Sequence, residues 1–167
     1  MIKNLKFKIE NLSGFTLVEA LLYIAISSVL LVVITNLGYN VFINRQKVLA
    51  GEEIIENANF VFAKIGYNIR KAKSVILPLS AGDELSLETK NPELNPTRFY
   101  LDGAAMFFAQ GIGSGAALTT NAIEITDLNF VKLTNNQTGI SIKINIELSS
   151  SRSGTRLSFT TTFNLPR

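Results

Sequence analysis

The residues that could carry chemistry in this chain are few, and their types exclude several kinds of site. Among 167 residues there is no histidine and no cysteine. Their absence excludes disulfide bonds, imidazole or thiolate metal sites, and catalysis by either side chain. The carboxylates of the second half are scattered without the spacing of a calcium-binding loop, namely Asp83, Glu84, Asp102, Glu124 and Asp127. We therefore expect no enzyme activity, no metal site and no cofactor.

One carboxylate stands apart, because Glu19 lies one turn inside a long apolar run. The 25 residues between Glu19 and Arg45 carry no formal charge, and as a helix they would extend roughly 37 Å, against about 30 Å for the hydrocarbon core of a bilayer. A carboxylate in lipid costs a few kcal/mol or more unless it is paired. No Lys or Arg lies between Lys8 and Arg45, so a partner must come from elsewhere.

A cut between Gly14 and Phe15 would supply that partner, because it creates a new α-amino group close to Glu19 in the sequence. In an assembly of parallel helices, the amine of one copy could pair with Glu19 of a neighbour. Such pairing recovers much of the cost of removing both charges from water, and it fixes the axial register of the helices. The spacing of these three residues therefore suits docking between subunits.

The run Gly14-Phe15-Thr16-Leu17-Val18-Glu19, followed by the apolar stretch, resembles the class III signal of type IV pilins and type II secretion pseudopilins. The resemblance implies cleavage after Gly14 by a prepilin peptidase, N-methylation of Phe15, and a docking role for Glu19 in assembly. It departs from many pilins in one respect, because no proline interrupts the apolar helix before Pro78.

The charge pattern around the apolar run predicts a membrane orientation. The leader, residues 1–14, carries Lys3, Lys6 and Lys8 against Glu10, while the rest of the chain is nearly neutral. Positive residues stay on the cytoplasmic side, so we expect a single-pass protein of the cell (inner) membrane with its body outside. A secretory signal peptide fits poorly, because the apolar run exceeds about 7–15 residues and no Ala-x-Ala-like site follows. A plain membrane anchor is the remaining alternative.

The apolar pattern then divides the chain into four parts. Residues 1–14 are a leader that is removed, 15–43 a transmembrane or filament-core helix, 44–73 its amphipathic continuation, and 74–167 a β-rich exposed domain. The continuation carries a helical stripe of Ile55, Ala58, Phe62, Ile65, Ile69 and Ala72, with Val48, Ile54 and Val61 beside it. A basic cluster of Lys64, Arg70, Lys71 and Lys73 suits the end of a helix electrostatically, with a binding patch as the alternative.

Beyond residue 74 the period changes to two, which is typical of half-buried strands. Residues 140–148 and 157–165 predict a hairpin about the polar turn 149–155, and residues 98–101 and 106–108 a second hairpin around Asp102-Gly103. Residues 123–133 predict a strand with an irregularity after Ile125, and residues 85–89 an early strand. We predict an α+β fold in which one long helix, residues 15–73, packs against an antiparallel sheet, as in the pilin-like lollipop.

The segment Gly111-x-Gly113-x-Gly115 lacks the Lys-Ser/Thr pair of a phosphate-binding loop and predicts a flexible surface loop.

These expectations lead to a structural subunit of a type IV pilus-like filament or type II secretion pseudopilus. The carboxyl half looks like that of the larger minor pilins, and the missing cysteine pair also favours a minor subunit. The expected partners are other subunits, which bind through the helix, the prepilin peptidase/methyltransferase, an inner-membrane assembly platform and the bilayer. The expected final location is an extracellular or periplasmic filament. A DNA-capturing competence pilus subunit is the second hypothesis, although residues 76–167 hold seven basic and eight acidic side chains and nucleic acid is not expected. A membrane-tethered enzyme is the third.

Overall fold

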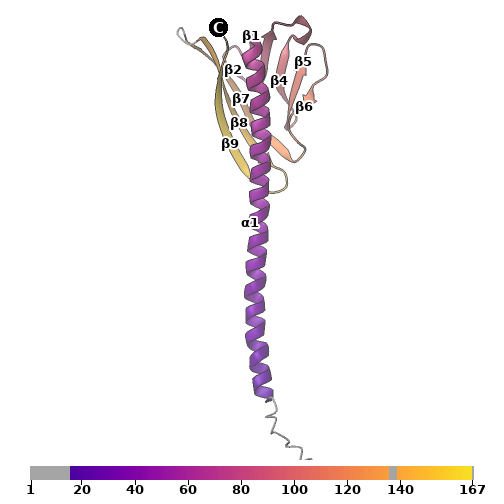
Figure 1. Ribbon diagram of the computed structural model, residues 1–167, viewed down its shortest axis with the longest axis vertical. Helices are drawn as coiled ribbons and strands as arrows, with labels where there is room; N and C mark the ends of the chain where they lie inside the picture. Colours follow the sequence, from indigo (N-terminus) through magenta and orange to yellow (C-terminus); the bar gives the residue numbers. More distant parts are fainter. Residues whose placement is uncertain (1–15, 136–138, 167) are drawn as a thin grey trace, which may run out of the picture. The chain divides into compact units, whose positions relative to one another are not determined.

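The computed structural model describes residues 16–135 and 139–166, and these divide into two units after Ile43 (Figure 1). The helix α1 (Leu17–Lys71) begins in the first unit and ends in the second. The predicted helix 15–73 is confirmed over these residues, but it ends two residues earlier than predicted, because Ala72 and Lys73 belong to a strand. Phe15 lies outside the described residues. The strand β1 (Ala72–Leu77) follows α1 without an intervening turn.

The second unit contains two antiparallel sheets. The first has the strand order β1-β3-β4-β5-β6, with β3 at Leu85–Thr89, β4 at Thr97–Asp102, β5 at Ala105–Gln110 and β6 at Ala116–Ala117. The second has the order β2-β7-β8-β9, with β2 at Ala81–Gly82, β7 at Ile123–Asn135, β8 at Gly139–Ser150 and β9 at Arg156–Asn164. A short 3-10 helix, Pro92–Leu94, lies between β3 and β4.

The two predicted hairpins are confirmed in register. In β4–β5 the turn after Asp102 contains Gly103, whose φ of 63° is the left-handed conformation that glycine adopts at no steric cost. In β8–β9, Ile142 lies opposite Phe163 and Ile146 opposite Phe159, so one face of the pair is largely apolar. The predicted irregularity in β7 is also confirmed, because its register with β8 shifts between Ile125 and Asp127.

A single apolar core joins the helix to both sheets. Figure 1 shows β7, β8 and β9 along one side of the second half of α1 and β4, β5 and β6 along the other. The core therefore needs side chains from all three layers, and burial of apolar area is its main source of stability. Its fully buried members include Ile54, Val61, Ile65 and Ile69 of α1, Leu85, Leu87, Phe99 and Met106 of the first sheet, and Phe130, Ile142, Ile144 and Leu148 of the second.

The buried face of α1 differs from the predicted stripe. Ala58, Ile65 and Ile69 are buried as predicted, but Ile55 is 46% exposed and Val48 is 60% exposed, while Ile54 and Val61 are fully buried. Neighbouring residues lie about 100° apart around a helix, so the face in contact with the sheets is centred on Ile54, Ala58, Val61 and Ile65. The stripe was therefore wrong at Ile55. Of the three apolar residues predicted beside it, Ile54 and Val61 are buried and Val48 is not.

Asn57 fixes the helix to the chain between the two sheets. Its side chain is 7% exposed, and its Oδ1 accepts a hydrogen bond from the Thr120 backbone N–H at 3.1 Å. Its Nδ2 donates to the Glu53 carbonyl at 2.9 Å. Both ends of the buried amide are thus satisfied, as a buried polar group requires. Thr120 lies three residues before Ile123, the start of β7, so this contact attaches to α1 the segment that leads from the first sheet into the second.

Two other expectations need correction. The predicted single sheet is two sheets, because β4 of the hairpin β4–β5 pairs with β3, which pairs in turn with β1, whereas β7, β8 and β9 form a separate sheet with β2. The glycine-rich segment lies at the surface as predicted, with Ile112 fully exposed, but it is held at both ends, because Gly111 donates its N–H to the Pro96 carbonyl at 3.1 Å and Leu118 donates its N–H to the Met106 carbonyl at 2.7 Å. These backbone bonds attach the segment to β4 and β5.

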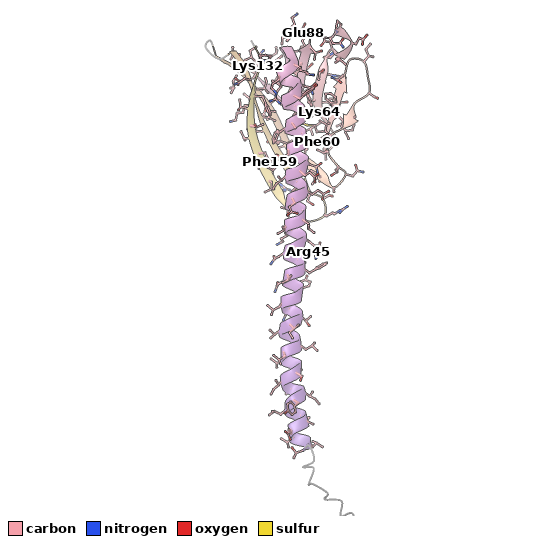
Figure 2. The ribbon with its side chains drawn as sticks, viewed as in Figure 1. Arg45, Phe60, Lys64, Glu88, Lys132 and Phe159 are labelled. Carbon is pink, nitrogen blue, oxygen red and sulfur yellow. The ribbon has the colours of Figure 1, made fainter. Side chains whose placement is uncertain are left out.

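The strand β9 lies close to α1 because of a glycine. Phe159 of β9 (Figure 2) packs edge-on against Phe62 with ring centroids 6.2 Å apart. One helical turn later, a Cβ added at Gly66 would lie 2.5 Å from Cε1 of Phe163. Only a residue without a side chain permits this approach, so Gly66 sets the distance between helix and strand.

We expect Gly66→Ala to destabilise the protein. Alanine favours the helix by about 1 kcal/mol, but displacing the Phe163 ring is overpacking, which costs about 1–3 kcal/mol. The net loss in the free energy of unfolding should reach up to about 2 kcal/mol, measured by urea denaturation in detergent with near-UV circular dichroism.

Gly51→Ala is the matched control, because nothing lies within 4 Å of a Cβ at that helical position. It should stabilise by up to about 1 kcal/mol, and Phe163→Leu should relieve the Gly66→Ala defect. Equal stabilisation by both glycine replacements would show that β9 does not pack tightly on α1.

Candidate assembly site at the start of the helix

The described part of the helix begins with a cap that involves Glu19. Thr16 precedes the first helical residue, Leu17, and its Oγ1 accepts a hydrogen bond from the Glu19 backbone N–H at 3.3 Å. The Thr16 carbonyl accepts the first helical bond, from Ala20 N–H at 3.1 Å. Thr16 is therefore the N-cap residue and Glu19 the third residue of the helix.

This position stabilises a carboxylate within its own chain. The first turn of a helix presents unpaired N–H groups and the positive end of the helix dipole, and both favour a negative side chain there. The sequence Thr16-x-x-Glu19 matches the capping-box pattern, in which Glu or Gln at the third position supports the cap. Sequence reasoning assigned Glu19 to docking alone and missed this second role, although the pattern was visible in the sequence.

Glu19 is nevertheless exposed and carries the only formal charge between Leu17 and Asn44. The large apolar side chains from Leu17 to Phe42 are 49–77% exposed. Soluble monomers rarely expose contiguous apolar patches above a few hundred Å², so this surface is typical of a segment that an apolar medium surrounds. By length and composition, this part of α1 can cross a membrane.

Two hydroxyl groups within the apolar run, those of Ser28 and Thr35, are satisfied by the helix itself. Ser28 Oγ donates to the Ala25 carbonyl and Thr35 Oγ1 donates to the Leu31 carbonyl, each at 2.8 Å. A hydroxyl that bonds to its own helix carries little cost in an apolar medium. Glu19 is different, because a carboxylate keeps its charge, so it is the residue in this run for which an external partner matters most.

The predicted cleavage site lies outside the described residues. Gly14 and Phe15 both belong to that part, so the proximity of a Phe15 amine to Glu19 stays a prediction. At the other end of the apolar run, Arg45 (Figure 2) and Lys47 are exposed on α1. Basic side chains there can reach the polar region of a bilayer while the apolar run lies in its core.

The carboxylates considered as catalytic or metal-binding groups are not brought together. Over residues 16–135 and 139–166, no three Asp or Glu side chains are placed to share a metal ion. Glu88, which the sequence did not single out, joins β3 to β1 through Ser74 Oγ at 2.6 Å, and this hydrogen bond with the nearby Lys73 holds its pKa below the usual range. It is a structural contact.

Comparison of the chain with protein-family models, with curated protein sequences and with solved structures finds no match.

Proposed function

We propose that this chain is a structural, minor subunit of a type IV pilus-like filament or type II secretion pseudopilus. The observation that carries the proposal is the exposed apolar helix surface from Leu17 to Phe42, with Glu19 as its only charge. The pilin-like signature at residues 14–19 supports it, as does the α+β architecture in which the second half of α1 packs against antiparallel sheets.

In this proposal the apolar helix has two successive environments. Before assembly the bilayer surrounds it, with the leader in the cytoplasm and the body outside, as the positive-inside rule predicts. After assembly, apolar helices of neighbouring subunits replace the lipid. The change costs little hydrophobic energy, because lipid tails and apolar side chains are similar media, so packing and polar contacts decide association.

Glu19 supplies the polar contact. Its carboxylate pairs with the amine of the processed Phe15 on an adjacent subunit, where both charges are shielded from water. A charge left unpaired in that medium costs a few kcal/mol or more, so a subunit that docks in the wrong register is penalised. The pair therefore determines the axial position of each incoming subunit.

Mass spectrometry of the N-terminus of the native protein tests this proposal. We expect a mature chain that starts at Phe15 and carries one N-methyl group. A Gly14→Leu variant should remain in the membrane with its leader attached, because a bulky side chain obstructs the cleavage site. An intact Met1 in cells that process related precursors would overturn the proposal and leave a plain membrane anchor.

A further inference from the structure

A cleft of about 620 Å³ lies beside the last two turns of α1. Its walls are the end of the helix, the segment that follows β3, and β5, so it lies wholly within the second unit. The volume is in the range of small-molecule sites, about 300–1,000 Å³. It is well separated in sequence from Glu19, and its ligand chemistry is independent of the proposed filament role.

The cleft is lined by positive side chains. Lys64, Arg70 and Lys71 come from α1, and Lys90 comes from the loop after β3. None of the described residues that line it carries a negative charge. Glu88, next to this loop, is already engaged with Ser74 and lies 3.5 Å from Lys73. The four cations therefore face the cleft without carboxylate partners among its lining residues.

Compensation of the helix dipole does not explain the positions of all four basic side chains in the cleft. The dipole effect is confined to the last turn of a helix, where only Arg70 and Lys71 lie. Lys64 is nearly two turns earlier, and Lys90 belongs to another segment. Bringing like charges together costs free energy, so their convergence from separate elements points to a negatively charged ligand.

Two aromatic rings hold the lysines in place. The Nζ of Lys64 (Figure 2) lies 4.5 Å from the centroid of Phe108, and the Nζ of Lys71 lies 4.1 Å from the centroid of Tyr67. Such cation–π contacts restrict an otherwise flexible ammonium group. They also occupy faces of both rings, so these rings present cations to the cleft rather than open platforms on which a nucleobase could stack.

The ionisation of Tyr67 reflects the same positive environment. Lys71 donates a hydrogen bond to the Tyr67 hydroxyl, and this bond, with the positive charges of Lys71 and Lys64, holds the pKa of the phenol below its usual value. Lys64 and Lys71 both line the cleft, so their charges also favour an anionic group placed in it. Amide groups of Asn91 and Gln110 also line it and can donate hydrogen bonds.

We infer that this cleft binds a small oligophosphate, an ion with several adjacent phosphate groups. Four converging cations match a ligand of several negative charges, and phosphate oxygens accept hydrogen bonds from Lys, Arg and amide groups. The limited volume of the cleft and the lysines lying over the two aromatic rings favour a compact ion over a nucleic acid strand, which would need stacking platforms and a longer basic track.

Isothermal titration of the full chain in a neutral detergent with inorganic triphosphate tests this inference. We expect saturable binding at one site per chain. Lys71→Gln and Lys90→Gln should each weaken it roughly tenfold, the effect of losing one charge-assisted hydrogen bond. The matched control is Lys143→Gln, which removes the same charge from β8, away from the cleft, and should leave the affinity unchanged. Far-UV circular dichroism verifies that each variant is folded.

Four outcomes would overturn the inference. One is the absence of saturable triphosphate binding, and another is an equal loss of affinity in Lys71→Gln and Lys143→Gln, which would indicate a general charge effect. The third is binding of single-stranded DNA to the protein that added triphosphate does not displace, which would indicate a nucleic-acid surface. Orthophosphate should bind at least tenfold more weakly than triphosphate, and equal affinities would show a site for one phosphate only.

Discussion

Glu19→Gln should reduce incorporation of the protein into filaments at least tenfold, as severely as Glu19→Ala. The amide is close in size to the carboxylate and can still support a capping box, which accepts Glu or Gln at the third helical position. It cannot form an ion pair with an amine in an apolar medium, where such pairing offsets the cost of burying both charges. A severe defect in Glu19→Gln would therefore assign the function of Glu19 to its charge.

The measurement compares the amount of each variant in sheared filaments with its amount in the membrane. Membrane insertion and removal of residues 1–14 should be normal in both Glu19 variants, because neither changes the apolar run or the Gly14–Phe15 bond. Thr16→Ala is the matched control, because it removes the N-cap hydroxyl that accepts from Glu19 N–H and leaves the carboxylate in place.

Loss of that cap costs the helix about 0.5–2 kcal/mol, so Thr16→Ala should retain most of its incorporation. The opposite pattern, with normal incorporation of Glu19→Gln and poor incorporation of Thr16→Ala, would show that helix capping is the main role of Glu19. The proposed pairing with a neighbouring amine would then be wrong. The three variants thus separate an interaction between subunits from one within a single chain.

Local sequence patterns predicted most of the elements of the fold. Strict alternation in residues 140–148 and 157–165 identified β8 and β9, and Asp102-Gly103 identified the β4–β5 turn. These signals are local, since a period of two fixes which face of a strand is buried and a glycine fixes a turn. The irregularity after Ile125 was visible for the same reason, because the alternation itself changes there.

Long-range arrangement was less accessible. The sequence did not indicate that the strands form two sheets, because strand pairing depends on which hairpins meet in space. It also did not indicate β1, which follows α1 directly without a glycine or proline to mark the change. The buried face of α1 was predicted at the wrong angle around the helix for a similar reason. Both Ile54 and Ile55 are apolar, and only the position of the sheets determines which of them is buried.

The candidate sites differ in the same way. Glu19 was evident because a charge in an apolar run is a local anomaly. Its cap by Thr16 was equally local and was overlooked. The basic cleft could be predicted only in part, because Lys64, Arg70 and Lys71 are close in sequence, whereas Lys90 and Phe108 reach them through the folding of β3 and β5. A basic helix end and a cleft with four cations cannot be distinguished without that fold.

The neighbouring residues Ile54 and Ile55 provide the second large expected effect. Ile54 is fully buried in the core that joins α1 to both sheets, whereas Ile55 is 46% exposed. Ile54→Ala should lower the free energy of unfolding by about 2–5 kcal/mol, because it removes buried methyl groups and leaves a cavity. Such a loss is a large fraction of the roughly 5–15 kcal/mol that stabilises a typical domain.

Ile55→Ala is the matched control, with identical chemistry one position later on the same helix. Surface substitutions usually change stability by less than about 0.5 kcal/mol, and alanine also favours the helix, so we expect little loss. Urea denaturation of the full chain in detergent, at concentrations where it is monomeric, measures both values.

If Ile55→Ala were the more destabilising, the stripe predicted from the sequence would be the true buried face, and α1 would be rotated by about 100° relative to the sheets. Comparable losses in both variants would instead indicate that the body covers a wider arc of the helix, because each side chain would then have to be buried to contribute so much.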